Sequence, residues 1–292
     1  CRFASKIPLN PIGCGFEVHQ ISGFVQFQTT PFLTYAFVSL KIVAYYGNYT
    51  LLVDKIIILL NTFLGSINAS VGNLIAEGNK QKIMSVFYEN CSLRYLCASF
   101  ISFVIYTFLE PFIELWLGEK YILGQVIVVL LALKMYVQAI AGNTYSFLFG
   151  FGLFADVWAA VVQSIIFLVV AIVGGYWYGL PGIITASIVS YFIIQCLWKP
   201  YYLFKKGFKE SLFPFVRYNF GMNVINSISI LLPIYLTKQL FPINSSSFNS
   251  LVINLIISMF VYLLTTLILY LSLSMSTRRL VRRILMNISV RR

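Results

Sequence analysis

The stretch that decides the fold runs from residue 157 to residue 177 and reads VWAAVVQSIIFLVVAIVGGYW. It contains no charged residue, and it matches the roughly 20 apolar residues that an α-helix needs to cross a bilayer. The rest of the chain has the same character, because 59% of its 292 residues are hydrophobic and only 10% are charged. A soluble domain is about 25% charged. The sequence therefore predicts an integral membrane protein with no room for a large soluble catalytic domain.

Seven further apolar runs accompany this stretch. The prediction is an all-α fold with eight transmembrane helices, at residues 30–46, 51–76, 93–116, 122–142, 157–177, 181–203, 219–240 and 251–272.

The positive charges predict the orientation of these helices. The net charge is +12, and 16 Lys and Arg residues fall in or beside the N-terminal segment, alternate connections and the C-terminal tail. The opposite connections offer only Lys120 and Lys238. Positive residues concentrate on the cytoplasmic side of membrane proteins, so both termini are predicted to be cytoplasmic. The same argument explains the basic charge without nucleic-acid binding.

No catalytic, cofactor-binding or metal-binding motif is present. The five cysteines lack metal or disulfide spacing, the single histidine is His19, and no nucleotide-binding loop or nucleophile motif occurs. The tail, residues 276–292, alternates Arg pairs with aliphatic residues, which is typical of a basic amphipathic helix on anionic lipid. The chain is not predicted to be an enzyme, and membrane lipids are its expected surroundings.

Three lysines fall inside the predicted spans: Lys41, Lys55 and Lys134. Ionisable residues at such depth are candidates for function. Lys41 is expected near the middle of the first span on one face with Tyr45, and Lys134 near the middle of the fourth span with Gln138 on its side. Both are candidates for a cationic substrate cavity, and a structural ion pair is the alternative for each.

The second span carries a polar stripe at helical spacing, formed by Asp54, Asn61 and Asn68 with two glycines. Cavity lining and a small-residue packing face are equally compatible with this stripe. Asp54 is followed by Lys55 near the expected outer end of the helix, so a local ion pair is an alternative for both.

Four more charged residues are interpreted from their place in the spans. Arg94 is expected to extend toward water at the cytoplasmic end of the third span. Glu110 and Glu114 share a face around Pro111 at the other end, with no nucleophile nearby. Asp156, before the fifth span, is expected to cap that helix, and a role in carrying a coupling proton is the alternative.

Several stretches together resemble a known family. They are GFVQFQTTPFLTYAFVSLKIVAYYGNYTLLVDK, SVGNLIAEGNKQK, LEPFIELWLGEKYIL, GLFADVWAAVVQSIIFLVVAIVGGYWYGLPGI and LWKPYYLFKKGFK, which lie between residues 23 and 209. In order and spacing they resemble polysaccharide biosynthesis membrane proteins, the Wzx-type flippases of the multidrug/oligosaccharidyl-lipid/polysaccharide exporter superfamily. Beyond Arg217 only the hydropathy is similar.

The resemblance implies a domain organisation. Residues 29–210 would form the second of two six-helix lobes, residues 211–275 two additional helices, residues 276–292 the cytoplasmic tail, and residues 1–28 a linker between lobes. The chain starts with Cys1, so a truncated N-terminus and a preceding first lobe are expected.

The resemblance also implies a function. Two lobes would alternate in access and flip undecaprenyl-diphosphate-linked oligosaccharide across the bacterial cytoplasmic (inner) membrane, coupled to H+ or Na+ and alongside glycan polymerases and glycosyltransferases. Lys41, Lys134, Lys55 and Arg94 are the candidates for binding the diphosphate, and Asp54 for coupling. A cation-coupled multidrug exporter and a non-transporting partner in glycan assembly are the alternatives.

Overall fold

The computed structural model describes residues 28–240 and 248–273. The predictions for the N-terminal segment, His19 and the tail at 276–292 lie outside these ranges. Helical residues 28–37 come first, and the elements that follow are α2 (Leu40–Ala76), α3 (Lys80–Leu117), a 3-10 turn (Glu119–Tyr121), α4 (Gln125–Gly150), α5 (Val157–Tyr178), α6 (Leu180–Tyr191), a π-helical segment (Phe192–Trp198), α7 (Lys199–Tyr202), a second π-helical segment (Leu203–Phe208), α8 (Phe213–Leu240) and α9 (Phe248–Leu273).

The described part of the chain contains seven helices that are long and apolar enough to cross a membrane, with residues 180–208 counting as one. The described residues are therefore all-helical as predicted, and these seven helices, where eight spans were predicted, support a multi-pass membrane protein. Each of the last six spans predicted from residue 93 onward overlaps one of these helices.

The beginning of the chain differs from the prediction. The expected connection at residues 47–50 lies inside α2, and the helix begins instead at Leu40. Ser39 is in an extended conformation there, and its hydroxyl accepts a hydrogen bond from the Ile42 amide, which is how an N-cap starts a helix. Tyr49 is fully buried, and its hydroxyl accepts a hydrogen bond from the Leu123 amide. These contacts outweigh the weak helix propensity of Gly47 and Asn48.

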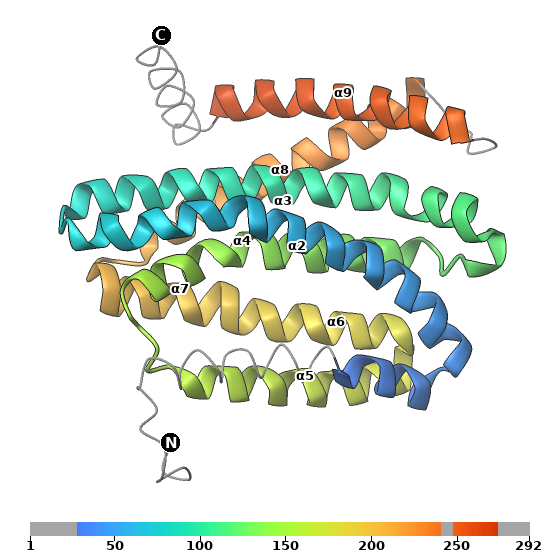
Figure 1. The fold of residues 1–292 in the computed structure, drawn as a ribbon, viewed down its shortest axis with the longest axis horizontal. Coiled ribbons are helices and arrows are strands. Elements are labelled where there is room, and N and C mark those ends of the chain that lie inside the picture. The colour runs from blue at the N-terminus through green and yellow to red at the C-terminus, as the bar shows by residue number, and fades with distance from the viewer. Residues whose placement is uncertain (1–27, 241–247, 274–292) are drawn as a thin grey trace.

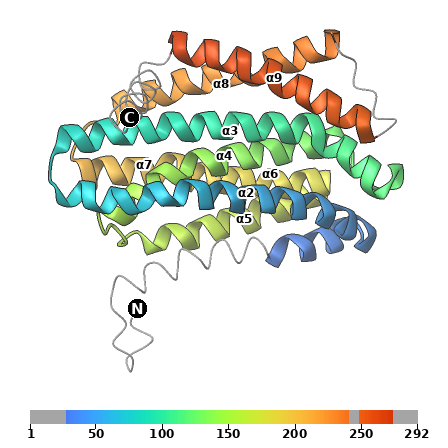
Figure 2. The ribbon, with the colours of Figure 1, turned by 45° about the horizontal axis from the view of Figure 1, so that its top comes forward.

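Consecutive helices run antiparallel, as Figure 1 shows for α2 to α6. α4 contacts α2, α3 and α6, and so occupies the middle of the bundle. α8 crosses α3 obliquely and leads to α9, and the two form an outer layer on α3 (Figure 2).

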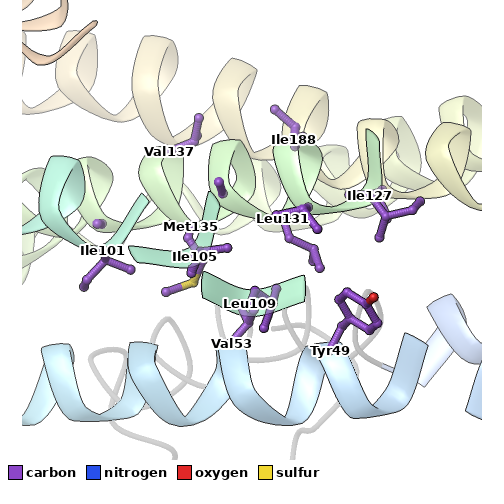
Figure 3. Close-up of a cluster of buried hydrophobic side chains, with 14 of the residues drawn as sticks. Tyr49, Val53, Ile101, Ile105, Leu109, Ile127, Leu131, Met135, Val137 and Ile188 are labelled. Atoms are coloured by element: carbon purple, nitrogen blue, oxygen red, sulfur yellow. The ribbon is translucent and has the colours of Figure 1, made fainter. Parts of the chain in front are cut away.

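The main core lies where α2, α3 and α4 meet. Figure 3 shows Tyr49 and Val53 of α2 facing Leu109 of α3 and Leu131 of α4. Since lipid is as apolar as these side chains, close packing rather than exclusion from water holds such helices together. The large apolar side chains that remain exposed on α5, α8 and α9 suit a surface facing lipid.

α5 and α6 form a hairpin with direct backbone contact. Gly179 makes the turn with φ of 62°, a conformation that favours glycine. Gly174 and Gly182 then face each other, so that a Cβ atom on Gly182 would lie 2.0 Å from the Gly174 carbonyl oxygen. Only glycine allows two helices to approach this closely.

Lysine residues are concentrated at one end of the bundle. Lys80 and Lys82 begin α3, and Lys205, Lys206 and Lys209 lie at the end of the helix that starts at Leu180. Lys80 forms an ion pair of 2.7 Å with Glu210, which joins two connections at this end. Lys120 follows α3 at the opposite end. The distribution along the bundle axis therefore follows the prediction from charge.

Candidate functional site

Arg94 is buried inside the bundle. Its side chain is 7% exposed, and Nη1 donates a hydrogen bond of 3.4 Å to the Ala139 carbonyl of α4. Gly142 makes room for it, since a Cβ atom there would lie 2.1 Å from Nη1. α3 continues for nearly four turns before Arg94, from Lys80. The expectation that Arg94 reaches water at the helix end is therefore wrong.

The charge of Arg94 has no acidic counterpart nearby. Within the ranges that the structure describes, no Asp or Glu forms an ion pair with it. Its neighbours include the side chains of Cys91, Cys97 and Tyr191, which are neutral at ordinary pH. A buried charge is normally paired, so the absence of an acidic ion-pair partner among the described residues makes Arg94 a candidate functional residue.

Lys134 and Asp54 form the second charged feature. Lys134 is the tenth residue of α4, about 14 Å from its start, and is half-buried. The Asp54 carboxylate of α2 attracts it across the two helices, without a direct ion pair among the described residues. Asp54 lies about 21 Å into α2. Its expected place near the outer end is wrong, because α2 starts earlier than predicted.

Lys41 and Lys55 are both exposed. Lys41 is the second residue of α2, so its expected place in the middle of a span is wrong for the same reason. Its Nζ atom lies 5.5 Å from the centre of the Tyr45 ring, a cation–π contact. Tyr45 in turn packs on Tyr121, with ring centres 4.6 Å apart. This cluster is at the end of the bundle that contains Lys120.

The remaining candidates are separated from one another. Asn61 of α2 is exposed, Gln138 of α4 is half-buried, and the side chain of Asn68 lies outside the described residues. Glu110 accepts a hydrogen bond of 3.1 Å from the Gly124 amide, just before α4. Glu110 therefore holds the connection to α4.

Asp156 has a partner that the sequence did not predict. It makes no capping hydrogen bond to α5, so the expectation of a cap is wrong. Its Oδ2 atom lies 2.9 Å from Nζ of Lys199, and the two side chains are 1% and 3% exposed. The pair joins the connection before α5 to the helix that contains α7.

A network of tyrosine and asparagine side chains attaches α8 to the bundle. Asn219, Asn223 and Asn226 recur at offsets of four and three, which places them on one face of α8. The tyrosine–asparagine network consists of these residues with Tyr95 of α3, Tyr136 of α4 and Tyr270 of α9. Sequence reasoning missed it, although the spacing of the three asparagines was a usable signal.

The bonds of this network link all four helices. Tyr95 donates to Asn219 over 3.0 Å, and Tyr136 donates to Asn223 over 2.7 Å. Asn226 donates to the Tyr136 hydroxyl over 3.0 Å and to the Tyr95 carbonyl over 3.1 Å, and it accepts from Tyr270. α8 and α9 are therefore joined to α3 and α4 by directional bonds as well as packing.

A small cavity of about 30 Å³ opens beside the network, lined among others by Tyr95, Thr144, Gln195, Cys196 and Asn219. Cavities of this size hold an ordered water when polar groups surround them. In residues 28–240 and 248–273 no group of three His, Cys, Asp or Glu side chains is placed to hold a metal ion. The cavity lining offers hydrogen-bonding groups to a polar molecule, and Arg94 places a buried positive charge in the same bundle.

Comparisons with known proteins identify no relative. No protein-family model, curated protein or solved structure matches the chain.

Proposed function

We propose that the chain forms part of a transporter that flips undecaprenyl-diphosphate-linked oligosaccharide across the bacterial cytoplasmic membrane. The observation that carries this proposal is the buried Arg94 with no acidic partner among the described residues. The order of the sequence motifs between residues 23 and 209, which resembles that of the flippases, suggests the kind of cargo.

A diphosphate fits the chemistry of this position. The planar guanidinium donates two parallel hydrogen bonds to phosphate oxygens, and such charge-assisted bonds are stronger than neutral ones. Arg94 donates to one carbonyl over 3.4 Å. Taking a cation out of water costs free energy, and folding has already done this for Arg94. An anion that binds beside Arg94 therefore gains the attraction of a charge that is already in position. Lys134 on the neighbouring helix would add a second positive charge on the path.

The transport step would need two bodies that alternate in access to one site. The described helices would supply one body, and the lipid chain would stay in the bilayer while the head group passes through. A proton or sodium gradient would drive the cycle, and glycosyltransferases and a glycan polymerase would make the cargo and consume it.

Binding of undecaprenyl diphosphate to the purified chain in lipid nanodiscs, measured by native mass spectrometry, tests the proposal. Hydrogen bonds to charged groups contribute about 1.5–3 kcal/mol. Arg94→Gln should therefore weaken binding by about 10- to 100-fold, and Arg94→Lys should weaken it less because the charge remains.

Lys120→Gln is the matched control, since it also removes one positive charge but at the far end of α3. It should bind like the unchanged chain. Undecaprenol, which lacks the diphosphate, should not compete. Equal binding by Arg94→Gln and the unchanged chain, with helix content preserved, would contradict the proposal. So would binding of a lipophilic cation but not of the diphosphate, which would favour drug export.

A further inference from the structure

The ion pair between Asp156 and Lys199 is unusual in its burial. Its nitrogen and oxygen atoms are 2.9 Å apart, and the side chains are 1% and 3% exposed. Two other ion pairs among the described residues, Lys80 with Glu210 and Lys82 with Glu77, have side chains about half exposed. Exposed pairs contribute little, whereas losing one partner of a buried pair leaves a charge with no compensation. The protonation state of Asp156 therefore has structural consequences.

Lys199 lies in a helix whose winding changes along its length. α7 is a single turn, Lys199–Tyr202, between the π-helical segments Phe192–Trp198 and Leu203–Phe208. A π-helix closes its hydrogen bonds one residue later than an α-helix, and such segments are rare and concentrated at functional sites. Because one residue corresponds to about 100° of rotation in an α-helix, a change of winding turns the side chains between the two segments.

The tryptophan next to Lys199 has a hydrogen-bond donor that is not used. The indole nitrogen of Trp198 is buried without a hydrogen-bond partner among the described residues. Its ring contacts Trp158, two residues after Asp156, with ring centres 4.7 Å apart, and it lies over Tyr202 at 6.3 Å. A buried donor without a partner disfavours the observed winding, so the contacts around it must hold that winding in place.

Both sides of the ion pair connect to other parts of the bundle. Asp156 belongs to the connection between α4 and α5. On the side of Lys199, Gln195 donates a hydrogen bond of 2.8 Å to Gln163 of α5 and lines the small cavity together with Tyr95 and Asn219. A rotation of the segment around Lys199 would therefore move Gln195, which lies beside the tyrosine–asparagine network.

We propose that Asp156 and Lys199 form a proton-operated latch that holds the winding of residues 192–208. When the Asp156 carboxylate is ionised, it binds the Lys199 ammonium and the segment keeps its two π-helical turns. When a proton from the aqueous side adds to the carboxylate, the attraction is lost and the segment changes register. Among the described residues, the charge of Asp156 also acts on the titratable side chain of Tyr202. The latch closes at high pH and opens as the pH falls.

Tryptophan fluorescence reports on this step without any knowledge of the cargo, so its result is independent of the proposed flippase activity. Trp116 and Trp177, which are exposed, are replaced with Phe, which leaves Trp158 and Trp198 beside the ion pair. The purified chain in nanodiscs is then titrated between pH 9 and pH 4. We expect a reversible, sigmoidal change in emission as the pH falls.

Two variants separate the latch from general effects of acid. Asp156→Asn removes the titrating group and should give the low-pH emission at every pH. Asp156→Asn combined with Lys199→Met removes both charges, leaves no charge stranded, and should also lose the transition. The matched control is Glu210→Gln. It removes the carboxylate of the exposed ion pair with Lys80 at the same end of the bundle and should keep the transition. Circular dichroism on each sample confirms that the helices persist.

Three results would overturn the latch. The first is an emission that does not change with pH while the helix content is constant. The second is the same transition in the double variant, because another group would then be titrating. The third is loss of the transition in Glu210→Gln.

Discussion

The position of the Arg94 guanidinium depends on the absence of a side chain at Gly142. A Cβ atom there would lie 2.1 Å from Nη1 and 2.9 Å from Cζ of Arg94. Contacts this short require the flexible end of the arginine to move, which would break its bond to the Ala139 carbonyl. The lack of a side chain at Gly142 therefore determines the direction in which the Arg94 guanidinium points.

Gly142→Ala should therefore weaken binding of undecaprenyl diphosphate about 10-fold and lower the free energy of unfolding by about 1–3 kcal/mol, the range for overpacking a tight site. The measurement is nanodisc binding together with unfolding in SDS. Gly65→Ala in α2 is the matched control, since a Cβ atom there meets nothing within 4 Å. It should leave binding unchanged and stabilise the helix by up to about 1 kcal/mol. Unchanged binding in Gly142→Ala would show that the guanidinium is not positioned by this contact.

Attachment of α8 rests on amide side chains rather than on aliphatic packing alone. Asn226 is 1% exposed and bonds to α3, α4 and α9. Its replacement would remove one hydrogen bond from a group on each of three helices: the Tyr95 carbonyl, the Tyr136 hydroxyl and the Tyr270 hydroxyl.

We expect Asn226→Ala to lower the free energy of unfolding by about 1–3 kcal/mol, because it leaves buried polar groups unsatisfied. Ser227→Ala should change it by less than about 0.5 kcal/mol, since Ser227 is exposed and bonds only within its own helix. SDS titration of both purified variants compares them. Equal stability of the two would mean that the network is not what holds α8 in place.

The helices themselves were predictable because hydrocarbon imposes a simple length requirement on apolar runs. The ends of the helices were less predictable, since the start of α2 depends on Ser39 and on the long-range contact of Tyr49 with Leu123. This shift moved Lys41 to an end and Asp54 to the middle.

Pairings between distant helices could not be derived from local pattern. Asp156 pairs with Lys199, and Tyr95 bonds to Asn226 across 131 positions. Of the candidate site residues, the sequence indicated Lys134 as an intramembrane cation but placed Arg94 at a helix end. The folded chain buries Arg94, with no acidic ion-pair partner among the described residues.

At the scale of the whole molecule, the distribution of charge along the bundle predicts its orientation in the membrane. The end that contains Lys80, Lys82 and Lys206 is the more positive one, and Lys120 lies at the opposite end. The positive-inside rule places the first end in the cytoplasm.

Labelling of single cysteines checks this orientation. In a background without the native cysteines, Lys120→Cys should react with an impermeant maleimide in intact cells, and Lys206→Cys should react only after the membrane is permeabilised. The reverse pattern would contradict the predicted topology.

Gly174 and Gly182 also matter while the chain is still being made. Their backbone contact joins two helices that follow each other directly and turn at Gly179. Such a hairpin needs no later segment in order to close, so α5 and α6 can enter the lipid from the translocon as one preassembled unit. The π-helical turns follow immediately, so the part of the chain with the most variable winding emerges onto a partner that is already in place.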